Sequence, residues 1–295
     1  MSSSIKRYLY IYRFDIFSLS IIVLLTLWFL DPIYGRGHIV FSDLAFGESS
    51  FRYLEEIYGA WNERWSTSTL LNVPRLAYIL PLYLLSRLFD FSGPLLLKSL
   101  ITVLVINAAI SMYLFTKRLA SVYFGRHFDF FRIFGLLTGA LFYSLNPWVI
   151  FRIQHIYLLV GYSLLPLVLM FFFNAFDPRF QRQLIIGYDI GHKRLYSRNV
   201  IDLSLMAFFF SVSAGAIHYF FYGLIFFFVL GFLLLAKSVM AHRNYCKRAT
   251  FVILRNFLAK IIVFSIVFLF FAAYWLSMYV GSILLGAQTS QHNIN

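Results

Sequence analysis

The chain is a succession of apolar runs, each about as long as a bilayer is thick, separated by charged segments. A helix needs about 20 apolar residues to cross a hydrocarbon core of roughly 30 Å. The runs at 95–115 and 257–284 reach that length almost without charge. A transmembrane β-barrel would show alternating segments of about 10 residues. Because 61% of residues are hydrophobic and only 13% are charged, we predict an all-α, polytopic membrane helical bundle.

Seven runs are predicted to span the membrane: 14–30, 95–115, 133–149, 156–173, 201–215, 220–236 and 257–284. The run at 75–89 is short and contains Pro81, so we expect a re-entrant or interfacial segment there. We predict a single transmembrane domain over 1–295. It consists of the first span, a first loop at 31–94, six further spans within 95–284 and a tail at 285–295.

Basic residues fix the expected orientation. Loops rich in Lys and Arg stay in the cytoplasm because they resist translocation. If the run at 75–89 does not span, most of the 25 Lys and Arg lie in four segments on one side: 1–13, 117–132, 177–200 and 237–255. The N-terminus is then cytoplasmic and the C-terminus is outside. This bias explains the net charge of +13 without a nucleic-acid partner.

The first loop collects acidic residues on the predicted outer side. Half of the 12 acidic residues lie between positions 31 and 63. An apolar stripe at helical spacing predicts an interfacial amphipathic helix; it consists of Phe51, Leu54, Tyr58, Trp61 and Trp65. This helix has the plain alternative of a solvated cover on the bundle.

Asp43 stands apart from that helix, in the apolar context "IVFSDLAFG". A carboxylate in apolar surroundings near a membrane is costly unless it is paired or used. Such surroundings favour a carboxylate that takes up a proton, as a general base does. The alternative is an ordinary loop or capping aspartate.

A second polar cluster falls in "FYSLNPWVIFRIQHIYLLVGYSLLPL", residues 142–167. Asn146 and Pro147 are expected to end a span, because proline restricts the residue before it. Arg152 and His155 then lie in an outer turn, and His218 lies in another. An arginine there can bind a phosphate through its forked donors, or can reach toward lipid headgroups. Each histidine has the alternative of an ordinary hydrogen-bonding residue.

The sequence does not specify a metal site. Cys246 is the only cysteine, which excludes an intrachain disulfide and a Cys-based metal site. No H-x-x-x-H pattern is present. If a divalent ion such as Mg or Mn is required, Asp43 is the only candidate ligand.

The first loop with its early aspartate, and the stretch from Asn146 to Pro166, resemble the GT-C superfamily of integral membrane glycosyltransferases. Arabinofuranosyltransferase-like and uncharacterised archaeal and bacterial members are the most similar. The resemblance implies transfer of a sugar from a polyprenyl-phosphate donor to an acceptor on the outer face of the cell envelope. It also implies that Asp43 is the catalytic base and that Arg152, His155 and His218 bind the donor phosphate.

Other readings stay open. Members of this family are commonly longer, so the chain could be a truncated or split member that needs a second chain. It could instead be a non-catalytic membrane subunit or scaffold. A transporter is less expected, because ionisable residues are almost absent from mid-span positions; Lys98, close to a span end, is expected to snorkel to the surface.

Overall fold

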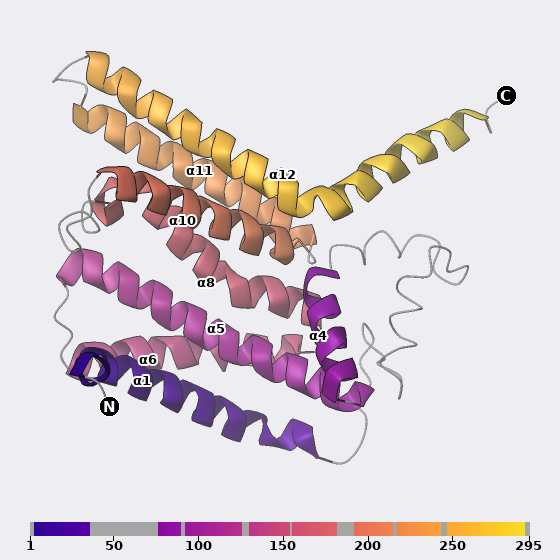
Figure 1. The fold of residues 1–295 in the computed structure, drawn as a ribbon. Helices are drawn as coiled ribbons and strands as arrows, with labels where there is room; N and C mark the ends of the chain where they lie inside the picture. The colour runs from indigo at the N-terminus through magenta and orange to yellow at the C-terminus, as the bar shows by residue number, and fades with distance from the viewer. Residues whose placement is uncertain are drawn as a thin grey trace. The chain divides into compact units, whose positions relative to one another are not determined.

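The fold, taken from a computed structural model, is helical throughout the part of the chain that the structure describes (Figure 1). The described residues are 3–35, 76–89, 92–125, 130–153, 155–181, 192–214, 217–242 and 247–292. The prediction of an all-α helical bundle is therefore confirmed.

Ten helical elements have both ends within the described residues: α1 (Ser3–Leu30), the 3-10 helix η1 (Asp31–Tyr34), α4 (Leu76–Phe89), α5 (Gly93–Phe124), α6 (Phe130–Ser144), α7 (Pro147–Arg152), α8 (Ile156–Phe176), α10 (His192–Ser213), α11 (Ile217–His242) and α12 (Lys247–His292). Asn146 precedes α7 as its N-cap, with Pro147 at the first helical position. Both features are typical helix-start signals.

Six stretches in these described residues are long and apolar enough to cross a membrane: Phe14–Tyr34, Gly93–Phe124, Phe130–Arg152, Ile156–Phe176, Tyr219–Ala241 and Thr250–Ser277. The chain is thus a multi-pass membrane protein. The span expected at 201–215 corresponds to the C-terminal part of α10, which is not among the six. Helix α4 has 14 residues within the described part of the chain, about 21 Å at 1.5 Å per residue. It is not among the six, and its re-entrant or interfacial position stays a prediction.

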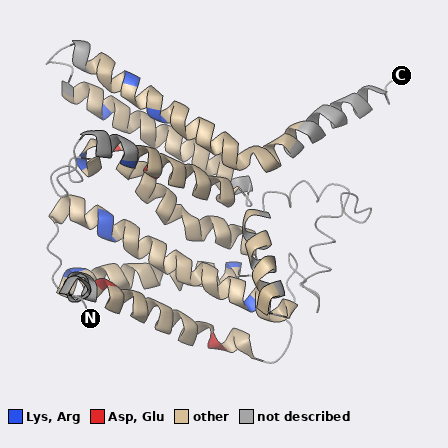
Figure 2. Ribbon diagram, in the orientation of Figure 1, with Lys and Arg blue, Asp and Glu red and all other residues tan. Residues whose placement is uncertain are grey.

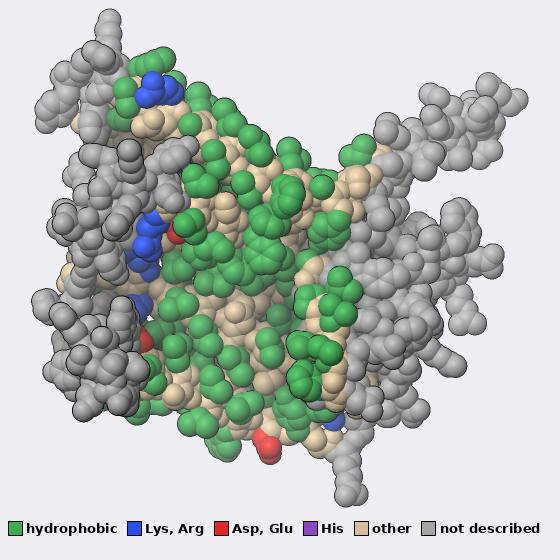
Figure 3. Space-filling view, viewed as in Figure 1, with side chains coloured by type: hydrophobic (Ala, Val, Ile, Leu, Met, Phe, Trp, Pro, Cys, Tyr) green, Lys and Arg blue, Asp and Glu red, His purple; other side chains and the backbone are tan. Residues whose placement is uncertain are grey.

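Figure 3 shows hydrophobic side chains covering the described helices on the face drawn, with Lys and Arg close to their ends. Contacts divide the chain into two compact units. Unit 1 comprises Met1–Ser50 and Ser86–Leu167, and unit 2 comprises Phe51–Leu85 and Val168–Asn295.

Unit 1 is built on an antiparallel pair of helices, α1 and α5. At one end, the Tyr34 hydroxyl and Thr102 Oγ1 are 2.7 Å apart. At the other end, the Tyr113 hydroxyl donates to Asp15 Oδ1 at 2.9 Å, and Lys117 forms an ion pair with the same carboxylate. Since Asp15 lies early in α1 and Lys117 late in α5, the two helices run in opposite directions.

The third helix of this layer, α6, packs on both α5 and α1 (Figure 1). Ala109 of α5 and Ala140 of α6 are fully buried in the core they share with Ile22. Small residues let membrane helices approach closely. The chain leaves α5 at Gly125, whose φ of +83° is costly for any residue with a Cβ.

Unit 2 is held by phenylalanine rings from α8, α10, α11 and α12. Phe210 of α10 is central, because its ring lies 5.3 Å from that of Phe220 and 5.6 Å from that of Phe227. Trp275 of α12 closes the cluster edge-on to Phe220 and its Nε1 donates to Ser211 Oγ at 3.4 Å. Aromatic pairs at these separations add dispersion and quadrupole attraction to ordinary packing.

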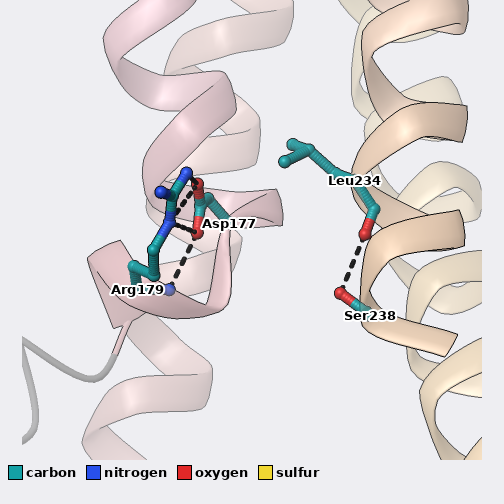
Figure 4. A network of polar contacts seen from close by, with 4 residues as sticks. All are labelled: Asp177, Arg179, Leu234 and Ser238. Atoms are coloured by element: carbon teal, nitrogen blue, oxygen red, sulfur yellow. Dashed lines mark hydrogen bonds and ion pairs between the residues drawn. The ribbon is translucent and has the colours of Figure 1, made fainter. Parts of the chain in front are cut away.

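The end of α8 in unit 2 is capped by polar side chains (Figure 4). The buried carboxylate of Asp177 accepts hydrogen bonds from the Arg179 guanidinium, at 2.6 Å for Nη2, and from the Arg179 main-chain N–H at 2.8 Å. Lys260 of α12 donates to the Ala175 carbonyl at 2.6 Å. On α11, Ser238 Oγ donates to the Leu234 carbonyl. Of these contacts, the one from Lys260 satisfies a carbonyl that the end of α8 would leave without a helical donor.

Gly223 of α11 provides a test of the aromatic core. A Cβ at this position would lie 2.7 Å from Phe210 Cε2, whereas one at Gly231 would be 3.5 Å from Phe257 Cζ. Gly223→Ala should therefore lower the free energy of unfolding by about 1–3 kcal/mol through overpacking. Gly231→Ala, on the same helix, should be neutral or slightly stabilising. Equilibrium unfolding in mixed micelles measures both, and equal effects would contradict this packing.

Candidate functional site

The first loop leaves and re-enters the same end of unit 1. We call this the first-loop end; it comprises η1 with Gly35, the start of α5 at 92–98, and residues 144–156 around α7. The opposite end, called the basic end, holds Asp15 and residues 117–132. Figure 2 shows the described charges close to the helix ends, with apolar helix between them.

At the first-loop end, two side chains of α5 hold the beginning of the loop. Lys98 Nζ donates to the Gly35 carbonyl at 2.8 Å. One turn later, Thr102 contacts the Tyr34 hydroxyl and also donates to the Lys98 carbonyl at 2.9 Å. Lys98 is only 7% exposed, although a lysine so close to a span end could also reach the surface. Its ammonium instead reaches a main-chain oxygen.

The turn between α6 and α8 is fixed by Asn146. Its Oδ1 accepts from the Val149 N–H at 3.1 Å, which caps α7. Its Nδ2 donates to the Tyr143 carbonyl at 2.6 Å and to the Tyr162 hydroxyl at 3.1 Å. One amide thus joins the end of α6, the start of α7 and the first half of α8. Helix α6 ends at Ser144, just before Asn146 and Pro147, while the apolar stretch continues through α7 to Arg152.

Tyr143 and Tyr162 form a reciprocal pair below this amide. The Tyr143 hydroxyl donates to the Tyr162 carbonyl at 2.9 Å, and the Tyr162 hydroxyl donates to the Tyr143 carbonyl at 2.7 Å. Their rings stack at 4.2 Å. Pro166 explains the first bond: it has no N–H to give to the carbonyl four residues earlier, which is that of Tyr162. A side chain of the neighbouring helix supplies the missing donor, as it must in a membrane.

Arg152 and His155 are brought together at this turn. Arg152 is the last residue of α7 and its side chain is exposed. The His155 N–H donates to the Arg152 carbonyl at 2.8 Å, and the His155 carbonyl accepts from Leu159 N at 3.1 Å. The histidine is half-buried. The turn therefore presents the guanidinium outward, beside Trp148, which is 40% exposed and 5.0 Å from the Tyr162 ring.

The other predicted site residues fall elsewhere. Asp43 and the predicted amphipathic helix at 51–65 lie outside the described residues. The main chain of His218 belongs to the first turn of α11 in unit 2, and its side chain is not among those described. In the part of the chain that is described, no group of three His, Cys, Asp or Glu is placed to hold a metal ion.

Sequence reasoning missed the polar contacts inside the spans. Asp15 with Tyr113 and Lys117 lies near the basic end, and the Ser163 carbonyl of α8 accepts from Ser111 Oγ at 2.8 Å. A lone Asp in the first span and a lone Lys 102 positions later are a complementary pair. No short-range pattern links them, because they meet only once α1 and α5 are packed.

Comparison of the chain with protein-family models, with curated proteins and with solved structures finds no match.

The tyrosine pair can be tested through Pro166. Tyr143→Phe removes the donor to the Tyr162 carbonyl and should lower the free energy of unfolding by about 1 kcal/mol, the usual range for hydrogen bonds between membrane helices. In a Pro166→Ala background, a main-chain N–H can replace that donor, so the same change should cost close to nothing. Unfolding in mixed micelles gives both values.

Tyr222→Phe on the exposed face of α11 is the matched control, because it removes a hydroxyl from a side chain that is 71% exposed. An equal loss for Tyr143→Phe with and without Pro166 would show that the hydroxyl does not compensate for the proline.

Proposed function

We propose that the chain is an integral membrane glycosyltransferase, or the conserved module of one, that uses a polyprenyl-phosphate sugar donor. The acceptor would react at the membrane face on which the first loop lies. Asp43 is proposed as the catalytic base and Arg152 as the main ligand of the donor phosphate, with His155 and His218 as weaker candidates. A second chain that completes the enzyme is part of this proposal.

The observation that carries the proposal is the placement of Arg152. Its side chain is exposed at the first-loop end of unit 1, where Lys98 also holds Gly35 at the beginning of the loop that contains Asp43. A guanidinium on a short helix at a membrane surface is well suited to a phosphate, since its donors match two oxygens at once. The exposed apolar residues Trp148, Ile150 and Phe151 suit a position beside lipid chains.

The chemistry needs these two groups in complementary roles. The acceptor hydroxyl attacks the anomeric carbon of the donor sugar and gives its proton to the Asp43 carboxylate. The new bond joins the acceptor oxygen to that carbon. The bond from the same carbon to the phosphate oxygen breaks, and the polyprenyl phosphate leaves with the electron pair. Arg152 stabilises the negative charge that grows on the leaving phosphate.

The basic end is proposed to face the cytoplasm. It carries Lys117, Arg118 and Arg132, and the start of α1 adds Lys6, Arg7 and Arg13. At the first-loop end of the same unit, the described side chains contribute only Lys98 and Arg152 as basic residues. Asp31 in η1 adds one negative charge to the same end. This asymmetry follows the positive-inside bias and puts the reaction on the outer face.

Transfer of labelled sugar in membranes tests the proposal. Asp43→Asn keeps the shape of the side chain but removes the base, so the rate should fall by about 100-fold or more. Arg152→Met should raise the KM for the donor by about 10-fold, the worth of a charge-assisted hydrogen bond. Arg132→Met, an exposed arginine at the basic end, should leave both parameters unchanged.

Equal transfer by the wild type and Asp43→Asn would remove this carboxylate from the mechanism. Absence of transfer from every polyprenyl-phosphate donor, with the folded chain and any co-purifying partner present, would favour a non-catalytic membrane subunit.

The proposed orientation can be read from the single cysteine. Cys246 lies in the connection between α11 and α12, on the predicted cytoplasmic side. A membrane-impermeant maleimide should label it in inside-out vesicles and not in right-side-out ones. A Trp148→Cys variant made in a Cys246→Ser background should show the opposite pattern. Labelling of both positions from one side would contradict the proposed topology.

A further inference from the structure

Among the described residues, Lys98 is a buried cation that has no role in the proposed reaction. It lies on a membrane-spanning helix, six residues into α5, and is only 7% exposed. A charged side chain in such surroundings is costly and, as a rule, is retained for a function. Its ammonium donates to a main-chain oxygen, that of Gly35, at 2.8 Å. The contact therefore fixes the path of the backbone, whatever side chain follows.

The contact belongs to a clasp of four residues: Tyr34, Gly35, Lys98 and Thr102. Two consecutive residues of the chain are held by two residues one turn apart on α5, because the Tyr34 hydroxyl is 2.7 Å from Thr102 Oγ1. Thr102 in turn donates to the carbonyl of Lys98 at 2.9 Å. The last clasp residue along this part of the chain is Gly35, the C-cap of η1.

A neutral donor could also hold a carbonyl, as Thr102 Oγ1 holds that of Lys98. A hydrogen bond from an ammonium to a carbonyl is stronger than one from a neutral donor, and it also puts a positive charge at the start of a loop rich in carboxylates. Asp43 follows Gly35 by eight residues, which reach at most about 28 Å when fully extended. Fixing Gly35 on unit 1 therefore limits the distance between Asp43 and the end of the unit that carries Arg152.

We propose that Lys98 is a positioning residue, which through the clasp holds the first loop on the first-loop end of unit 1 in the geometry that catalysis needs. The effect on catalysis rests on the proposed glycosyltransferase function, whereas the holding of the loop does not. Lys98 acts on the backbone of Gly35 and has no contact with the substrate.

Tryptic cleavage after Arg36 measures the clasp without any substrate. A protease needs an extended stretch on both sides of the bond it cuts, so this cleavage requires Tyr34 and Gly35 to leave α5. When the clasp opens and closes fast relative to cleavage, the cleavage rate follows the population of the open form. Cleavage after Arg52, farther along the same loop, provides an internal reference, and mass spectrometry resolves the fragments.

Lys98→Met should raise cleavage after Arg36, relative to cleavage after Arg52, by about tenfold, the worth of a hydrogen bond to a charged group. Lys98→Arg keeps the charge and should restore the wild-type ratio. Lys237→Met, which removes an exposed lysine of α11, is the matched control and should change nothing. Thr102→Val opens the clasp by a second route and should also raise the ratio.

In the transfer assay, Lys98→Met should lower kcat by the fraction of the closed clasp that is lost, while the donor KM stays constant and Lys98→Arg recovers kcat. An unchanged cleavage ratio in Lys98→Met, or in Thr102→Val if Lys98→Met does not fold, would overturn the proposal. So would a raised donor KM at constant kcat, which would make Lys98 a substrate ligand. Raised cleavage in a chain without transfer activity would refute the glycosyltransferase and leave the clasp standing.

Discussion

The fold depends on the requirement that every backbone polar group inside the bilayer find a partner within the protein. Pro166 makes this visible, because it deprives the Tyr162 carbonyl of its helical donor, and the Tyr143 hydroxyl takes that place. The same need explains why the Ser163 carbonyl receives Ser111 and Asn107 from α5, and why Lys260 reaches the Ala175 carbonyl at the end of α8. Each of these side chains joins two helices while it satisfies a backbone oxygen. Polar residues in the spans are thus the specific contacts of a bundle whose remaining packing is mostly apolar.

These contacts also decide what the first-loop end can do. The reciprocal tyrosines and Asn146 set the turn before α8 as a rigid unit, since the Asn146 amide alone bonds to Tyr143, Tyr162 and Val149. A guanidinium at the end of a short helix is useful for binding only if the helix itself is held, because a site gains affinity from groups that are already in place. Arg152 is exposed, and the elements under it are not free to move independently. This arrangement supports the proposed binding of a phosphate by Arg152.

The length and hydrophobicity of the runs were enough to predict the helical membrane class, and the Asn146-Pro147 pair marks the break that follows α6. These features are local, because apolar length and proline chemistry act within a few residues. The contact that Lys98 makes was not predictable from its local sequence. A lysine near a span end can snorkel, whereas here the ammonium donates to a carbonyl 63 positions earlier. The pairing of Asp15 with Lys117 was hidden for the same reason.

The candidate site likewise has a part that the local sequence predicts and a part that depends on contacts between distant segments. Arg152 and His155 could be expected in one turn, because only two residues lie between them, and the structure places them there. The role of Asp43 depends on where a long loop folds back, and neither periodicity nor spacing encodes that. What does bear on it is the energetic cost of Lys98. Burying this ammonium is costly, and its bond to the Gly35 carbonyl is stronger than one from a neutral donor. The proposed role of Lys98 therefore rests on what the held segment carries, because Asp43 follows Gly35 by eight residues.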